Sequence, residues 1–371
     1  MENKEIEVNK LKILHITNSI DGGGVGFVIA NFCTEQVGKG ISFDIVAENI
    51  GRKQRLHERF ATAGFGIHYV IPKKKSLWRN VVQMARLMKK GHYDGVHVHF
   101  EEWSFLYLML AWLCGIPMRV CHAHMAYMPG SDTKPHYKLF RVLLNLFATT
   151  RLACSKDAGS HLFRRHPYIV LNNAIDSKAY RFDCNKRERM RAKLNVEGKL
   201  VIGVVGRLTF QKNPQMSIEI LREIRKKRKD AVMIMVGTGA LKKEIIQLIE
   251  TYDLVDAVRL LGFRQDVPEI MQAMDVFLLP SRWEGLGIVY VEAQAAGLYT
   301  FGTDEVVPKE VAVCPDLMKF VPRESTAAEW ASAALSVLPY ERRVTTHRIT
   351  EAGYDLLTER EKLINIYCKE R

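Results

Sequence analysis

Short apolar runs and helical patterns alternate along the whole 371-residue chain. Several runs, such as Val201–Val205 and Val232–Val236, are apolar at almost every position, which is typical of strands buried on both faces of a parallel sheet. Strands that alternate with helices form right-handed βαβ units. The sequence predicts strands at 11–18, 43–47, 68–71, 95–100, 119–124, 151–154, 169–171, 200–205, 231–236, 258–261, 276–280, 298–302 and 319–321.

This alternation is interrupted once, by a charged stretch from Ser177 to Lys199 without a strand pattern. We therefore expect an N-terminal domain over residues 1–178, a C-terminal domain over 179–357, and a final helix within 358–371 that packs back on the N-terminal domain or stays with the C-terminal one. The predicted fold class is α/β, with two Rossmann-like, doubly wound parallel-sheet domains facing a central cleft. The carboxyl ends of both sheets would open into that cleft.

Charge and cysteine content narrow the class of protein. Lys and Arg exceed Asp and Glu by 54 to 41, and residues 1–180 carry 24 basic against 14 acidic residues. This excess favours anionic partners, but no aromatic-basic motif points to nucleic acid. The seven cysteines are widely spaced, which indicates free thiols in a reducing cytoplasm. The charged segment Met1–Lys10 has no signal-peptide core, and the apolar run Trp103–Cys114 is too short to span a bilayer and predicts a buried helix.

The most informative motif follows the strand predicted at 276–280. A loop carries Glu284 and Gly285, and a helix begins near Gly287 and carries Glu292. A helix N-terminus presents unsatisfied N–H groups that suit a phosphate, and the two carboxylates could accept hydrogen bonds from hydroxyl groups on either side of it. The pattern is that of a nucleotide-sugar site; the alternative is an ordinary strand–loop–helix with two unrelated glutamates.

A second motif follows the strand predicted at 200–205. Arg207 and Lys212 flank a loop that leads into a helix, with Asn213 as the expected N-cap and Pro214 at the first helical position. Two cations at the carboxyl end of a strand can hold a diphosphate leaving group. A pair of solvated surface charges remains the alternative.

Two weaker signals lie in the first half. The turn Gly22–Gly26 opens a helix and could hold an anion, but it matches neither G-x-G-x-x-G nor a P-loop. His122 and His124 end another predicted strand, and His124 would point into the cleft, although a structural histidine is equally consistent. The His-x-His spacing could indicate a metal, yet no third clustered ligand is evident from the sequence. No Asp-x-Asp motif is present to hold a metal-bound diphosphate.

Together these segments resemble the retaining glycosyltransferases of family 4, which have the GT-B fold. The resemblance rests on the E-x7-E signature from Glu284 to Glu292, the Arg207 and Lys212 pair, the glycine-rich first loop and His124, and it extends over nearly the whole chain. The segment Val170–Asp176 is similar to that of the exopolysaccharide and capsule branch.

The resemblance implies a role for each site residue. The donor diphosphate would be bound by Arg207, Lys212, Gly23, Gly24, Gly287 and Ile288. Glu284 and His124 would act at the donor sugar as catalytic residues, Glu292 would bind the ribose, and Phe263 and Arg264 would border the base. No cofactor and no metal are expected, because the acceptor proton would pass to a phosphate oxygen on the same face of the sugar, which retains the configuration.

The implied activity is transfer of a hexose from a nucleotide-diphosphate sugar, a UDP-sugar in the first instance, to a glycan or polyprenyl-linked saccharide in surface polysaccharide synthesis. The alternatives are a GT-B-fold nucleotide-sugar epimerase and a non-catalytic sugar-nucleotide-binding subunit. We also hypothesise that the basic helix within Lys134–Arg151 contacts an anionic membrane at its cytoplasmic face. A core helix with solvated basic edges is the alternative.

Overall fold

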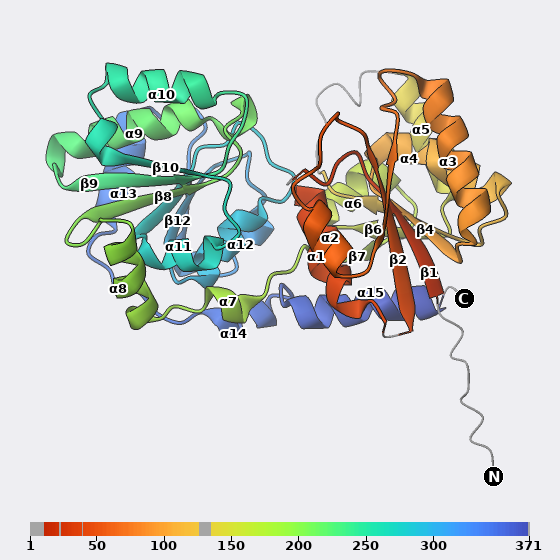
Figure 1. Ribbon diagram of the computed structural model, residues 1–371. Coiled ribbons are helices and arrows are strands. Elements are labelled where there is room, and N and C mark those ends of the chain that lie inside the picture. Colours follow the sequence, from red (N-terminus) through yellow and green to blue (C-terminus); the bar gives the residue numbers. More distant parts are fainter. Residues whose placement is uncertain (1–10, 22–23, 39, 126–134, 370–371) are drawn as a thin grey trace, which may run out of the picture. The chain divides into compact units, whose positions relative to one another are not determined.

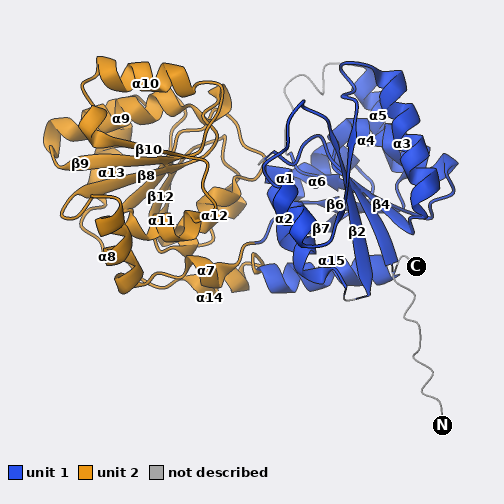
Figure 2. Ribbon diagram, viewed as in Figure 1, with its two compact units in different colours: residues 1–174, 356–371 blue, residues 175–355 orange. Residues whose placement is uncertain are grey.

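The computed structural model describes residues 11–21, 24–38, 40–125 and 135–369 (Figure 1). The chain forms two compact units, one of residues 1–174 with 356–371 and the other of residues 175–355 (Figure 2). Within the described residues, no helix is both long enough and apolar enough to cross a bilayer.

Unit 1 contains a seven-stranded parallel sheet in the order β3-β2-β1-β4-β5-β6-β7. Its strands are β1 (Leu11–Ile16), β2 (Ile41–Glu48), β3 (Gly66–Val70), β4 (Gly95–Val98), β5 (Met118–Ala123), β6 (Thr150–Ala153) and β7 (Ile169–Val170). The helices are α1 (Gly24–Cys33), α2 (His57–Thr62), α3 (Leu77–Gly91), α4 (Ser104–Leu113), α5 (Pro135–Phe147), α6 (Lys156–Phe163) and α15 (Leu356–Lys369).

Unit 2 repeats this architecture with six parallel strands in the order β10-β9-β8-β11-β12-β13. The strands are β8 (Leu200–Val205), β9 (Ala231–Val236), β10 (Val258–Gly262), β11 (Val276–Leu279), β12 (Tyr299–Thr303) and β13 (Met318–Val321). The helices are α7 (Ser177–Tyr180), α8 (Cys184–Lys193), α9 (Pro214–Lys227), α10 (Lys242–Thr251), α11 (Val267–Ala273), α12 (Ile288–Ala295), α13 (Ala327–Ser336) and α14 (Thr346–Glu351).

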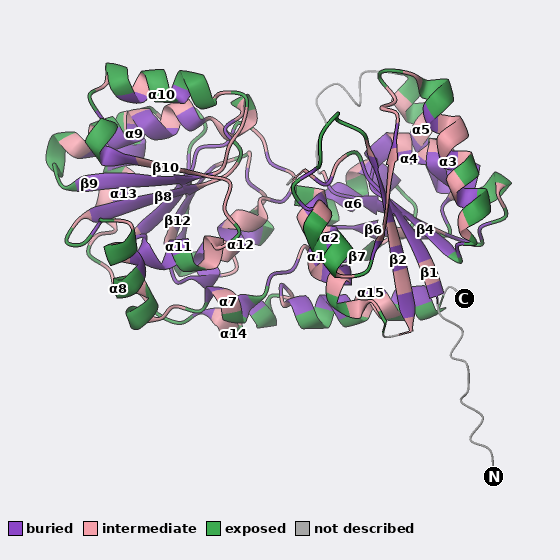
Figure 3. Ribbon diagram, in the orientation of Figure 1, coloured by how far each residue is buried: buried purple, intermediate pink, exposed green. Residues whose placement is uncertain are grey.

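Each unit is therefore a doubly wound α/β domain, as the alternation of apolar runs predicts. The central strands are buried because helices cover both faces of each sheet (Figure 3). In unit 2 the strand order reverses between β8 and β11, and in unit 1 between β1 and β4. At such a point the loops that follow the two strands diverge, which leaves a natural ligand position at the carboxyl edge of the sheet.

The two units divide at slightly different residues from the predicted domains. The chain changes units after Ala174, because Ile175 donates its backbone N–H to the Tyr354 carbonyl at 3.0 Å and α7 packs on α11, α12 and α14. A boundary after residue 178 would divide α7 itself, which spans Ser177–Tyr180. At the other end, α15 packs on α1 of unit 1, with Leu363 and Tyr367 in the same apolar core as Phe32.

The apolar run Trp103–Cys114 forms α4, which buries Tyr107, Leu108 and Ala111 but leaves Trp112 and Leu113 more than half exposed. The prediction of a buried helix thus holds for its inner face and is wrong for its C-terminal end. The basic segment forms α5, whose Arg141 is buried and contacts the Glu102 carboxylate at 2.8 Å. Arg141 is therefore not a solvated basic edge, and Lys134 lies outside the described residues.

Candidate functional site

The loop after β8 brings the second motif to the carboxyl edge of the unit 2 sheet. Arg207 is exposed and donates to the Gln211 side-chain oxygen at 3.3 Å. Pro214 occupies the first turn of α9, as predicted, and Asn213 stands at the N-cap with a φ of 51°. The Asn213 side chain does not cap the helix; it accepts from the Arg282 guanidinium at 3.2 Å.

The loop after β11 joins this first loop through a buried ion pair. Lys212 Nζ lies 2.6 Å and 2.8 Å from the two carboxylate oxygens of Glu284, and the Ser281 hydroxyl donates to Glu284 Oε1 at 2.6 Å. Only 3% of the Glu284 side chain is exposed, against 16% for Lys212. An ammonium group has three protons, so Lys212 can hold Glu284 and still donate to a phosphate.

Backbone contacts hold these two loops in register. The Arg282 N–H donates to the Gln211 carbonyl at 2.8 Å, and the Gln211 side-chain amide donates to the Trp283 carbonyl at 3.0 Å. These contacts involve residues next to Lys212 and next to Glu284, so they fix the positions of both partners of the ion pair. Such a site is preorganised before a ligand arrives.

The helix α12 begins beside this ion pair, with Gly287 at its N-cap. Gly287 has a φ of 79°, and a Cβ there would lie 2.7 Å from the Tyr290 ring, so a side chain at this position would be strained. Among the described residues, no side chain caps the helix at Gly287. Tyr290 donates its N–H to the Gly287 carbonyl at 3.0 Å, whereas the N–H groups of Ile288 and Val289 can serve an anion. The structure thus brings Lys212, Glu284, Gly287 and Ile288 to one edge.

Farther along α12, Glu292 is half-buried, and its carboxyl is hydrogen-bonded to the buried Tyr180 hydroxyl at the end of α7. Burial raises the pKa of Glu292 to about 7, although the hydrogen bond from Tyr180 acts in the opposite direction. Tyr180 was not indicated by the sequence, because its approach to Glu292 depends on the folding of α7 onto α12.

The raised pKa of Glu292 predicts how the free energy of unfolding depends on pH. A carboxyl whose pKa is raised on folding favours the folded state below its unfolded pKa and loses that contribution as pH rises through the folded value. We expect the free energy of unfolding of Glu292→Gln to exceed that of the wild type by about 3 kcal/mol at pH 8, and to match it near pH 4.5. Urea denaturation at the two pH values measures this, and an equal difference at both would contradict the raised pKa.

Two glycines of the loop after β9, which are not among the predicted site residues, complete this edge. Gly237 has a φ of 137°, and a Cβ on it would lie 1.9 Å from the Gly206 carbonyl oxygen. A Cβ on Gly239 would lie 2.2 Å from the Leu208 carbonyl oxygen. Because the loops after β8 and β9 approach so closely, the Arg207 loop has a fixed backbone. The Gly-x-Gly directly after a strand was the available signal.

We expect Gly237→Ala to destabilise unit 2 by about 3 kcal/mol, since both the backbone angle and the space exclude a methyl group. Gly206→Ala is the matched control: a Cβ there would meet its nearest atoms at 3.6 Å, an ordinary contact. Thermal or urea unfolding compares the two variants. Equal stabilities would show that the close approach of the two loops is not required.

The predicted base-bordering residues follow β10 on the same sheet. Arg264 donates from Nε to Asp266 at 2.7 Å, and Gly262 accepts from the Gly237 N–H at 2.7 Å. Phe263 lies between them and is half-buried. These residues are thus tied to the loop after β9, two strands from the centre of the site.

The remaining predicted residues belong to unit 1. Gly24 begins α1 and is exposed, whereas Gly23 lies outside the described residues. His124 follows β5; its backbone N–H donates to the Glu101 carboxyl at 2.8 Å and its Nε2 lies 2.7 Å from His99 Nδ1. Burial lowers the pKa of His124 to about 3, so the ring is neutral. Burial disfavours the charged form of Glu101 as well, and raises the pKa of its carboxyl to about 8.

The expectation that His122 and His124 have no third clustered ligand is wrong. His99 lies within reach of both, and His15 and His97 extend the same cluster. The repeated His-x-His spacing at 97–99 and 122–124 was the signal in the sequence. It could not be combined with His15 until the order β1-β4-β5 was known.

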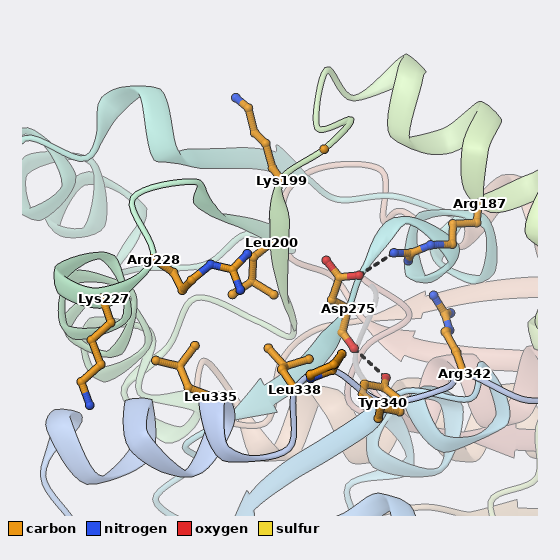
Figure 4. A pocket seen from close by; sticks show the side chains of 12 residues that line it. Arg187, Lys199, Leu200, Lys227, Arg228, Asp275, Leu335, Leu338, Tyr340 and Arg342 are labelled. Carbon is orange, nitrogen blue, oxygen red and sulfur yellow. Dashed lines mark hydrogen bonds and ion pairs between the residues drawn. The ribbon is translucent and has the colours of Figure 1, made fainter.

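A cavity of about 760 Å³ lies at the opposite edge of the unit 2 sheet (Figure 4), near the starts of β8 and β11. Two of its basic side chains are committed to the protein. Arg187 pairs with Asp275 at 2.5 Å, and the half-buried Arg342 donates to the carbonyl oxygens of Met271, Gln272 and Met274. These contacts hold α11 and β11 in place. The cavity has neither the Lys212–Glu284 ion pair nor the helix N-terminus that lie at the carboxyl edge of the sheet.

Comparison with known proteins adds two domain matches. Residues 22–178 match the model of Glycosyltransferase Family 4, and residues 186–355 match that of Glycosyl transferases group 1. The chain is 27% identical over 370 residues to the "Putative glycosyltransferase EpsF" of Bacillus subtilis (strain 168), with 96% of each chain covered.

A second relative is an Escherichia coli UDP-Gal:alpha-D-GlcNAc-diphosphoundecaprenol alpha-1,3-galactosyltransferase. It is 32% identical over 233 residues, which cover 59% of this chain and 60% of that protein. Among solved structures, Anabaena Alr3699/HepE in complex with UDP-glucose aligns over 97% of this chain and 100% of its own, with a TM-score of 0.78 and 18% identity. That likeness establishes the fold, with two Rossmann-like domains of the GT-B type.

Proposed function

Because the chain belongs to the glycosyltransferases, with a family 4 domain followed by a group 1 domain, we propose that it transfers a hexose from a UDP-sugar with retention of configuration. The observation that carries this proposal is the ion pair of Lys212 and Glu284 beside the uncapped N-terminus of α12. A carboxylate held next to a phosphate-binding helix end can accept sugar hydroxyls while the diphosphate is held.

The charges at this edge suit departure of a diphosphate. Negative charge develops on the phosphate oxygens as the bond to the sugar breaks, and fixed positive groups stabilise it. Lys212, the exposed Arg207 and the first turn of α12 supply such groups without a metal ion. The Glu292 carboxyl, farther along the same helix, would accept the ribose hydroxyls.

The acceptor that we propose is a polyprenyl-diphosphate-linked saccharide in surface polysaccharide synthesis. The Escherichia coli relative carries such an acceptor in its name, and Bacillus subtilis EpsF and Staphylococcus aureus CapH are similar to this chain over much of their length. CapH is named as a capsular polysaccharide biosynthesis glycosyltransferase.

The direct test is a transfer assay with UDP-galactose, UDP-glucose and UDP-N-acetylglucosamine, a lipid-diphosphate-linked sugar acceptor, and EDTA throughout. We expect an α-linked product by NMR, with turnover unchanged by EDTA. Release of an epimerised nucleotide sugar without transfer would support the epimerase alternative. A strict requirement for a divalent ion would contradict charge neutralisation by Arg207 and Lys212.

We further propose that unit 1 contacts an anionic membrane where that acceptor is presented. The outward face of α5 carries Leu139, Val142 and Leu146, all more than half exposed at a helical spacing. Trp112 at the end of α4 extends this apolar surface, with its ring 5.5 Å from that of Phe147. An apolar helix face of this kind can lie in the headgroup region of a bilayer.

The double substitution Leu139→Asp/Leu146→Asp should reduce co-sedimentation with phosphatidylglycerol vesicles by about tenfold or more, because it places two charges in the apolar face. Leu357→Asp is the control, since Leu357 is equally exposed on α15. Vesicle binding that survives the double substitution would remove this surface from the proposal.

A further inference from the structure

Five histidines lie together on one face of three neighbouring strands in unit 1. In the parallel ladder, His15 of β1 is paired with His97 of β4, and Val98 with Cys121 of β5. Residues two apart on a strand share a face, so His97 and His99 are aligned, and so are His122 and His124. All five side chains are buried.

The ring nitrogens of this cluster converge. His15 Nδ1 lies 3.1 Å from His99 Nε2, and His97 Nε2 lies 3.2 Å from His122 Nδ1. In the triad of His99, His122 and His124, one nitrogen of each ring lies within 4.8 Å of the others. Four-coordinate sites hold their nitrogen ligands about 2.0–2.1 Å from the ion, so small rotations of these rings suffice to surround one.

Two nitrogens of that triad have no partner among residues 11–21, 24–38, 40–125 and 135–369. These are His122 Nε2 and His124 Nδ1, both of which are buried. A buried polar atom without a partner destabilises the fold unless something satisfies it. A small cavity of about 10 Å³ lies beside the cluster, between His15, His97, His99 and His122 and apolar side chains of α1, and His124 does not line it. The converging ring nitrogens alone therefore indicate where an ion would lie.

From this arrangement we propose that unit 1 binds one divalent transition-metal ion, Zn²⁺ in the first instance, through His99, His122 and His124. Neutral imidazole nitrogens suit zinc, whereas magnesium and calcium prefer oxygen ligands. The Glu101 carboxyl accepts the His124 backbone N–H and so holds that residue in place beside its neighbours. Metal-binding histidines are commonly oriented by partners on their second nitrogen, as His15 orients His99 here.

This ion has no part in the charge neutralisation proposed for unit 2. An ion on His124 would occupy the ring that the resemblance assigns to the donor sugar. On the proposed function, therefore, the metal-free protein is the form that transfers sugar, and removal of zinc would not impair it. The metal-binding experiment needs neither donor nor acceptor, so its outcome is independent of whether the transfer activity is correct.

The experiment begins with the full chain treated with EDTA and exchanged into metal-free buffer. Titration with ZnCl₂ against a chromophoric chelator should give one zinc per chain, and MgCl₂ should give none. His122→Gln should weaken zinc binding by about 100-fold or more through loss of one ligand. His166→Gln, at an exposed histidine of the same unit, should leave the affinity unchanged.

A second measurement on the wild type guards against a His122→Gln variant that fails to fold. Cobalt(II) bound to the triad should show the visible d–d bands of a four-coordinate, nitrogen-ligated ion, and zinc should displace it. Absence of stoichiometric zinc binding and of these bands would overturn the proposal. An affinity that is unchanged in a folded His122→Gln variant would overturn it as well.

Discussion

Glu284→Gln is expected to lower turnover by about 10³-fold while binding of the UDP-sugar changes by less than about tenfold. The side chain keeps its shape, so Ser281 and Lys212 retain a hydrogen-bonding partner, but the negative charge is lost. A group that acts mainly on the reacting sugar contributes to the transition state more than to the ground state. The change should therefore appear in kcat, and little in the dissociation constant.

The two quantities can be measured separately, by initial rates of transfer and by calorimetric titration with the UDP-sugar. Glu324→Gln, at an exposed position of the same unit, serves as the control for loss of one negative charge. Turnover of Glu284→Gln within a few fold of the wild type would refute the catalytic role. Loss of binding with unchanged kcat would make Glu284 a donor-binding residue only.

Lys212→Met has the second large expected effect, and it acts on both stability and binding. Removing the ammonium leaves the Glu284 carboxylate buried without its ion partner, which should destabilise unit 2 by about 3 kcal/mol. It also removes a charged donor to the diphosphate, so the dissociation constant for the UDP-sugar should rise about 10- to 100-fold.

The double variant Lys212→Met/Glu284→Gln separates these effects. Because no unpaired charge is left in the site, it should recover most of the lost unfolding free energy, although it remains inactive and binds donor weakly. Unfolding in urea measures the recovery. If the double variant were as unstable as Lys212→Met, the ion pair would not be the cause of the destabilisation.

The sequence was sufficient to predict where the strands lie, and to predict the loop and helix that carry Glu284 and Glu292. Near-continuous apolar runs such as Val201–Val205 predicted β8, and the spacing of Glu284 and Glu292 predicted the loop and helix that hold them. A strand that is buried on both faces of a parallel sheet needs apolar side chains at nearly every position. Its pattern can therefore be read from a few consecutive residues.

What the sequence did not reveal depends on contacts between distant segments. Lys212 and Glu284 are 72 residues apart, and their pairing follows only from the adjacency of β8 and β11. The burial of Arg141 against Glu102 likewise depends on α5 packing close to the loop after β4. A basic helix pattern alone indicated solvated charge there, whereas the exposed surface of α5 is largely apolar.

The central claim is that a sugar nucleotide binds at the carboxyl edge of the unit 2 sheet by cationic side chains and a helix N-terminus. A crystal structure of the chain with a UDP-sugar tests this most directly. We expect the diphosphate within hydrogen-bond distance of Arg207, Lys212 and the Ile288 N–H, with the ribose at Glu292. A nucleotide found instead in the cavity lined by Arg187 and Arg342, at the opposite edge of the same sheet (Figure 4), would contradict the account.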